Sequence, residues 1–156
     1  MNCSAQEIYT LLHHYDHILV TAHVSPDGDA LGSVLALWHW LKAEGKDAVM
    51  VIDDDIDDRY NFLDGLSAIC RPDQVKTDAS WLTVVLDATG LGRIGKTADL
   101  VCGKVLNLDH HVSNEHFAQW EYFKPDYAAT GEILTCLFDQ WHITWSPARA
   151  DALYTA

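Results

Sequence analysis

The sequence predicts one α/β domain built on a doubly wound, mainly parallel sheet with helices on both faces. Four apolar segments of strand length each run into polar residues, at 17–22, 48–53, 82–87 and 104–109. Such continuous apolar runs are typical of parallel strands that are buried on both faces. Helical patterns accompany these segments along the chain. With 156 residues, of which 49% are hydrophobic, the chain can form one sizeable core.

The first two helices are predicted from their end signals. A helix over residues 5–15 is expected because Ser4 and Glu7 have the spacing of a capping box, in which the two side chains satisfy free backbone N–H groups. After the first strand, a turn-forming Pro-Asp-Gly-Asp segment precedes an Ala-, Leu- and Trp-rich helix. That helix is expected to extend to Lys42 and to be ended by Gly45.

The second half of the chain predicts one more strand and two more helices. A short apolar run at 120–123 is expected to add an edge strand before a helix over 130–140. A serine followed by Pro147 supplies a cap and a first-turn proline for a last helix that begins near Ala148. The acidic run 53–58 is interpreted as a solvated loop that leads into a short helix.

Composition restricts the classes of function. Ten Lys and Arg residues against 23 Asp and Glu residues give a formal net charge of −13, which opposes binding to a long nucleic acid and favours a small anionic substrate held by metal. The four cysteines are scattered and no signal peptide precedes them. We therefore expect reduced, mostly buried thiols in a cytoplasmic protein. The longest apolar runs are far too short to span a membrane.

Polar side chains gather where three of the predicted strands end. In an open α/β sheet, ligands bind outside the carboxyl ends of the strands, because loops and helix N-termini converge there. So many carboxylates without lysine partners would repel one another, and divalent cations would remove that cost. Carboxylate oxygens with imidazole nitrogens suit Mn²⁺ or Mg²⁺ better than structural zinc, and catalytic zinc, iron or cobalt stays open. The residues concerned are His23, Asp27, Asp29, Asp87, Asp109, His110 and His111.

The spacing of these residues is compatible with two metal ions. His23 and Asp27 can hold one ion while Asp29, near the helix start, points toward a second, and Asp87 could bridge both. Two ions about 3.5–4 Å apart can share a hydroxide and stabilise both the attacking and the leaving oxygen at phosphorus. Hydrolysis of a phosphoester or a phosphoanhydride follows from such a site.

Simpler interpretations exist for several of these residues. Asp27 or Asp29 could merely cap a helix, with a histidine on the surface beside it. Arg93 could contact a substrate phosphate, but an arginine near a short helix more often pairs with a local carboxylate, so it is not counted as catalytic. Asn114 and Thr130 are interpreted as a turn former and a helix cap rather than as ligands.

Four segments resemble, in order, the successive motifs of DHH-family phosphoesterases, and are closest to the bacterial oligoribonuclease/pAp-phosphatase branch of the DHH–DHHA1 group. The resemblance extends over most of the chain from about Ile18 onward. Four motifs in the right order are specific, whereas one alone would be weak. The segments are 23–33 (HVSPDGDALGS), 86–89 (LDAT) with 93–95 (RIG), 107–114 (NLDHHVSN) and 129–134 (ATGEIL).

The resemblance implies a fold, a cofactor and roles for the site residues. It implies a DHH domain whose cofactor is Mn²⁺, two ions per site, with Mg²⁺ or Co²⁺ as substitutes. His111 would face the substrate phosphate, and Asp109 would orient the neighbouring histidines. The implied metal ligands are His23 and Asp27 for the first ion, Asp29 and His110 for the second, and Asp87 between them.

The chain departs from the family pattern in two respects. Family members continue past a segment like 152–155 to one more metal-binding aspartate, which Asp151 does not match, and they carry a C-terminal DHHA1 domain that grips the substrate. We therefore expect residues 1–156 to be a DHH catalytic domain truncated at its C-terminal end, with DHHA1 absent and with weak or no activity alone. The resemblance also implies a homodimer.

Three functions are compatible with these residues. The leading hypothesis is Mn²⁺-dependent hydrolysis of short oligoribonucleotides or of 3′-phosphoadenosine 5′-phosphate (pAp) and similar nucleotides. The second keeps the site and changes the substrate to pyrophosphate, polyphosphate or a linear or cyclic dinucleotide. The third is a fragment that binds metal or nucleotide without turnover. Partners other than these small substrates, namely long nucleic acids and membranes, are not expected.

Overall fold

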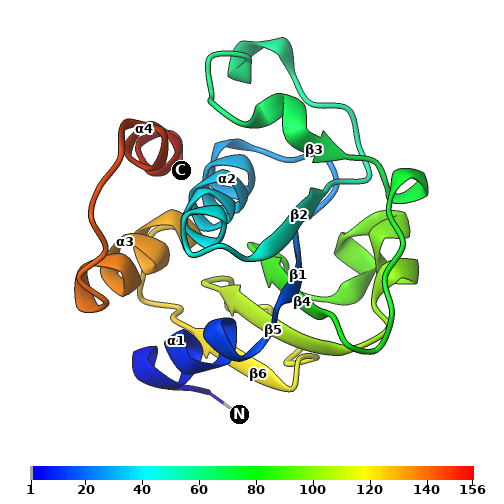
Figure 1. Ribbon diagram of the computed structural model, residues 1–156, viewed down its shortest axis with the longest axis horizontal. Helices are drawn as coiled ribbons and strands as arrows, with labels where there is room; N and C mark the ends of the chain where they lie inside the picture. Colours follow the sequence, from blue (N-terminus) through cyan, green and yellow to red (C-terminus); the bar gives the residue numbers. More distant parts are fainter. Residues whose placement is uncertain (1) are drawn as a thin grey trace.

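The computed structural model describes residues 2–156 and is organised around one six-stranded sheet in which all neighbouring strands pair in parallel (Figure 1). The strand order is β3-β2-β1-β4-β5-β6, so the chain winds outward from β1 and then returns to place β4 on the other side of β1. This order confirms the predicted doubly wound parallel sheet. The strands are β1 (His17–Thr21), β2 (Asp47–Val51), β3 (Ile69–Cys70), β4 (Leu82–Leu86), β5 (Lys104–Asp109) and β6 (Trp120–Phe123).

The two faces of the sheet are covered differently. Three α-helices lie on one face, and a fourth packs on the outer side of α2 (Figure 1). Short 3-10 helices cover the other face, where they pack over β4 and β5. Helices on both faces are therefore confirmed, but one layer consists of 3-10 turns. The α-helices are α1 (Ala5–His14), α2 (Gly28–Ala43), α3 (Thr130–Gln140) and α4 (Pro147–Thr155). The 3-10 helices on the second face are η4 (Leu91–Arg93) and η5 (Gly95–Leu100), and η3 (Pro72–Gln74) contacts η5.

The core follows from the alternation of side chains along the buried strands. In β4 every residue is buried, yet Val84 belongs to the core under the α-helices and Val85 to the smaller core under the 3-10 helices. Successive side chains of a strand point to opposite faces, so a central strand must be apolar throughout. The predicted helix ends also hold, because Ser4 and Glu7 form the capping box and α3 has the predicted bounds.

Two local expectations are confirmed, and one is wrong. The acidic run leads into a 3-10 turn, η1 (Asp58–Tyr60), and β6 is an edge strand. The cysteines were expected to be mostly buried, but Cys102 is exposed and two others are half-buried. Cys102 lies in a loop, Cys70 in the two-residue strand β3 and Cys136 in α3, and the spacing of the cysteines in the sequence could not reveal these positions.

Among residues 2–156 no helix is long and apolar enough to cross a bilayer.

Helices α2 and α4 approach so closely that a glycine is required between them. A Cβ atom added to Gly32, in the second turn of α2, would clash with the backbone oxygen of Ala152 in α4. A carbonyl oxygen of a packed helix cannot move aside as a flexible side chain would. The end of α4 therefore lies against the first turns of α2, close to the carboxyl edge of the sheet.

We predict that Gly32→Ala lowers the free energy of unfolding by about 1–3 kcal/mol because it overpacks this contact. In an exposed helix the same substitution would instead be expected to stabilise by about 1 kcal/mol. Gly92→Ala is the control, since a Cβ atom there meets nothing within 4 Å. Urea denaturation of both variants measures the effect, and a stabilised Gly32→Ala variant would show that the close approach is wrong.

Candidate metal centre

The predicted site residues meet at the carboxyl edge of the sheet. His23 follows β1, Asp87 follows β4, and Asp109 is the last residue of β5. Strands β1, β4 and β5 are neighbours, so their ends bring these side chains together. The N-termini of α2 and α3 reach the same edge and add Asp29 beside His110. The gathering expected from the strand ends is therefore present.

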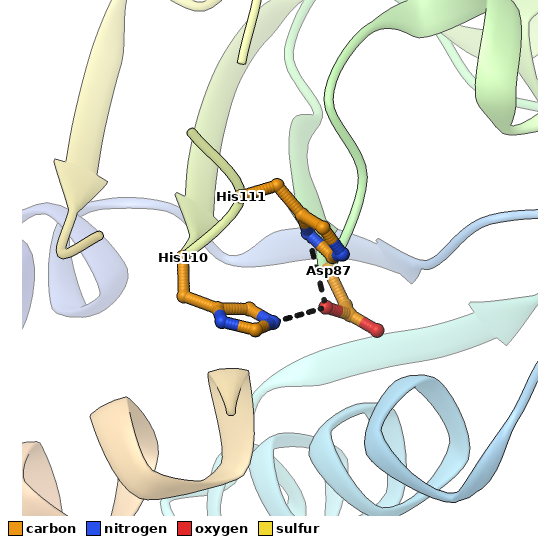
Figure 2. Close-up of side chains that lie close together, drawn as sticks. All are labelled: Asp87, His110 and His111. Carbon is orange, nitrogen blue, oxygen red and sulfur yellow. Dashed lines mark ion pairs between the residues drawn. The ribbon is translucent and has the colours of Figure 1, made fainter. Parts of the chain in front are cut away.

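Asp87 is at the centre of this cluster. Its backbone φ is 54°, in the left-handed region that few residues other than glycine, asparagine and aspartate adopt. Its side chain is 2% exposed, and its Oδ2 lies 3.4 Å from Nε2 of His23. Its Oδ1 lies 3.6 Å from Nε2 of His110 and 3.6 Å from Nδ1 of His111, as Figure 2 shows. Three imidazole rings thus face one buried carboxylate.

Backbone carbonyl groups determine which ring nitrogen of His23 and of His110 faces the site. Nδ1 of His23 lies 2.7 Å from the carbonyl oxygen of Val24, and Nδ1 of His110 lies 3.1 Å from that of Tyr127. A carbonyl oxygen only accepts, so Nδ1 carries the proton in both rings and Nε2 points toward Asp87. This arrangement is typical of metal-binding histidines, which donate their second N–H to a carbonyl or carboxylate.

The contact between His23 and Asp87 requires a cation. The hydrogen bond to Asp87 raises the pKa of His23, against the opposing effect of burial. Burial alone would raise the pKa of Asp87, but the hydrogen bond to His23 and the charge of His111 outweigh it, and the pKa is lowered. Protonation of His23 would supply that positive charge. A divalent ion bound to Nε2 of His23 would displace that proton and supply the positive charge in its place.

Asp29 has two tasks. Its Oδ2 accepts the backbone N–H of Thr130 at 2.7 Å and its Oδ1 accepts that of Gly131 at 2.7 Å, so it caps α3 from another part of the chain. Its Oδ2 also lies 3.6 Å from Nε2 of His110. Burial, together with the charge of Asp87, raises the pKa of Asp29 to about 6. Crowding of two carboxylates is thus present, as expected for a site that a cation would relieve.

Two groups of three potential ligand residues emerge among residues 2–156, and they share Asp87. In each group the ligand atoms lie within 4.8 Å of one another. The second group differs from the ligand set that the resemblance implies. It contains His111 in place of Asp29, and Asp29 lies next to His110. The ligand roles themselves stay predictions. The groups are His23, Asp27, Asp87 and Asp87, His110, His111.

The ring of His111 is held by a second buried carboxylate, that of Asp109. Its Nδ1 donates to Oδ1 of Asp109 at 2.7 Å, and Asp109 is fully buried. Burial alone would lower the pKa of His111, but the hydrogen bond to Asp109 and the nearby charges outweigh it, and the pKa is raised. The ring is 42% exposed. Its position fits the predicted role of facing a substrate.

Two residues interpreted as structural from the sequence have direct contacts in the site. Thr130 is the first residue of α3, and its hydroxyl donates to Oδ1 of Asp87 at 3.1 Å. The side-chain amide of Asn114 donates to Oδ2 of Asp109 at 2.6 Å. Asn107, which was not singled out from the sequence, contacts Asn114 from within β5. A buried asparagine inside an apolar strand was the available signal for it.

A pocket of about 400 Å³ opens beside the cluster. Arg93 is exposed at this pocket and has no ion pair within the described part of the chain, so the expected pairing with a local carboxylate is not found. It is the one lysine or arginine among the lining residues, and its carbonyl accepts the backbone N–H of Val24 at 2.8 Å. The pocket is lined by His23, Asp27, Asp87, Ala88, Thr89, Arg93, His111 and Ser113.

The model of the DHH family, N-terminal domain, matches residues 17–156. The chain belongs to this family. The matched region includes every residue of the two ligand groups as well as Asp29, Asp109 and Arg93. The family membership predicted from the four motifs is therefore confirmed.

Curated relatives include two with informative names. The chain is 34% identical over 139 residues to the bifunctional oligoribonuclease and PAP phosphatase NrnA of Thermus thermophilus, which covers 88% of this chain and 41% of that protein. It is 27% identical over 142 residues to the probable bifunctional oligoribonuclease and PAP phosphatase NrnA of Streptococcus mutans, covering 90% of this chain and 44% of that protein. The chain thus spans less than half the length of either relative.

Solved structures share the fold. An exopolyphosphatase-related protein from Bacteroides fragilis superposes with a TM-score of 0.88 at 26% identity, over 97% of this chain and 48% of that one. A putative family II inorganic pyrophosphatase from Methanococcus jannaschii gives a TM-score of 0.65 at 19% identity, over 89% of this chain and 47% of that one. The second likeness concerns the fold alone.

We predict that Asp27→Ser separates capping from metal binding. Oδ1 of Asp27 accepts the backbone N–H of Ala30 at 3.1 Å and so caps α2, a task that serine performs equally well. Asp27→Ser should keep the stability of the metal-free chain, whereas Asp27→Ala should lose about 1 kcal/mol. Both should bind Mn²⁺ more weakly in calorimetric titrations. Wild-type Mn²⁺ affinity in Asp27→Ser would reduce Asp27 to a helix cap.

Proposed function

We propose that this chain is the DHH part of a metal-dependent phosphoesterase that hydrolyses short oligoribonucleotides or pAp-like nucleotides with two Mn²⁺ ions. The observation that carries the proposal is the presence of Asp87 in both groups of ligand residues. A carboxylate with one oxygen toward each group is suited to bridge two ions. The names of the relatives from Thermus thermophilus and Streptococcus mutans support the substrate class.

The donor atoms favour Mn²⁺ over a structural zinc ion. They are carboxylate oxygens and imidazole nitrogens, with no thiolate among the residues of the two groups. His23, Asp27 and Asp87 would hold one ion, and Asp87 with His110 and Asp29 would hold the other. When bound, such a pair lowers the pKa of water and stabilises charge on the attacking and leaving oxygens.

The residues around the ligands would bind and orient the substrate. The Nδ1–H of His111 is engaged by Asp109, so its Nε2 is left for an oxygen of a phosphate in the pocket. Arg93 offers a second positive group on the same pocket wall. A guanidinium group matches the geometry of two phosphate oxygens. These two residues would supply the positive charge that a chain of net charge −13 otherwise lacks.

A second candidate function keeps the site and changes the substrate. The likeness to an exopolyphosphatase-related protein, at 26% identity and a TM-score of 0.88, favours a polyphosphate or pyrophosphate substrate. Such substrates need the same metals and the same phosphate contacts but no pocket for a base. The two candidates therefore differ in substrate preference rather than in the residues of this site.

Hydrolysis assays on the 156-residue chain test the proposal. Because the chain spans less than half the length of its named relatives, we expect slow Mn²⁺-dependent phosphate release from pAp and slow cleavage of pApA. Asp87→Asn should abolish both reactions, and Asp139→Asn, an exposed residue of α3, should not change them. Faster release from pyrophosphate would favour the second candidate. Hydrolysis that persists in Asp87→Asn or without a divalent ion would contradict the proposal.

We predict that Arg93→Ala weakens the binding of pAp to the Mn²⁺-loaded chain about tenfold, or about 1.4 kcal/mol, because a charged hydrogen bond to phosphate is lost. The affinity for Mn²⁺ itself should not change. Arg59→Ala is the control, since Arg59 is an exposed arginine paired with Asp57 away from the pocket. Fluorescence or calorimetric titration measures both affinities, and an unchanged affinity for pAp would remove Arg93 from the site.

A further inference from the structure

Two buried asparagines, Asn107 and Asn114, lie beneath the metal centre and contact each other. Nδ2 of Asn114 donates to Oδ1 of Asn107 at 2.8 Å. Both side chains are almost completely buried, at 1% and 8% exposure. Buried side-chain amides are costly unless their donors and acceptors are satisfied, so their partners are informative.

Asn107 holds the turn that carries Asp87. Its Nδ2 donates to the carbonyl oxygen of Val85 at 3.1 Å and to that of Ala88 at 3.2 Å. These carbonyl groups lie on either side of Asp87, whose φ of 54° is unfavourable for a residue with a side chain. Such a conformation persists only when its surroundings hold it. The two bonds from Asn107 supply that support from β5.

Asn114 holds Asp109 from the side opposite to His111. Its Nδ2 donates to Oδ2 of Asp109 at 2.6 Å, while Oδ1 of the same carboxylate accepts Nδ1–H of His111 at 2.7 Å. Its own Oδ1 accepts the backbone N–H of His116 at 2.8 Å. The amide therefore cannot be flipped without placing its oxygen against a carboxylate. This fixes the rotation of Asp109 and, through it, the ring of His111.

We propose that Asn107 and Asn114 act as one positioning unit that sets Asp87 and His111 relative to each other. This inference rests on the proposed function, because it assigns both residues to the same metal-dependent site. Neither residue is a metal ligand or a catalytic residue in this proposal. Each acts through a carboxylate or a turn that reaches the site. Partners of this kind change metal affinity or activity about 10- to 100-fold when they are removed.

The first test observes His111 in the metal-free protein by ¹H–¹⁵N NMR of the histidine rings. We expect a solvent-protected Nδ1–H signal for His111 in the wild-type chain and its loss in Asn114→Ala. Asn61→Ala is the matched control, because its amide also donates to an aspartate, Asp58, at 3.2 Å but lies at the surface. Ile8→Val, a core change in α1, controls for general destabilisation. Both controls should keep the signal.

The second test measures Mn²⁺ binding. Asn107→Ala should raise the Mn²⁺ dissociation constant about tenfold through release of the Asp87 turn, and both control variants should match the wild type. The inference is overturned if folded Asn114→Ala keeps the His111 signal, if folded Asn107→Ala binds Mn²⁺ like the wild type, or if Ile8→Val produces the same losses. The NMR signal requires neither metal nor substrate. A wild-type chain that keeps the signal but does not bind Mn²⁺ would therefore count against the proposed function alone.

Discussion

The site depends on a single buried carboxylate in an unfavourable backbone conformation. Asp87 is 2% exposed, has a positive φ and faces the rings of three histidines. A carboxylate of this kind is stable only with a cation beside it, because burial without a partner would neutralise it. Protonation of His23 or His111 would supply that charge in the metal-free chain. A divalent ion bound there would replace the proton as the source of positive charge.

The winding of the sheet explains why this carboxylate has so many partners. The chain winds outward from β1 through β2 to β3 and then returns to β4. Strands β1 and β4 are therefore neighbours, although the 60 residues 22–81 lie between them in the sequence. Loops after these strands leave in opposite directions and create a crevice at the carboxyl edge. Asp27 and Asp29 each have two roles, because each caps a helix and also faces the crevice. Capping and metal binding are thus compatible rather than competing interpretations.

Much of this arrangement could be predicted from the sequence, and the remainder could not for identifiable reasons. Apolar runs predicted the four long strands, and their polar ends predicted the gathering of His23, Asp87 and Asp109. β3 has only two residues and the second face carries 3-10 turns, so neither has a periodic pattern to detect. The cap of α3 by Asp29 joins residues 101 positions apart, which no local pattern can reveal. Asn107 differs from its apolar neighbours, but its partners are visible only in three dimensions.

We propose that two metal ions share Asp87. Crystals of the chain grown with Mn²⁺, measured at the manganese absorption edge, would locate the ions directly. We predict two anomalous peaks about 3.5–4 Å apart with the Asp87 carboxylate between them. One peak that is bound by a single ligand group, or two peaks that do not contact Asp87, would contradict it.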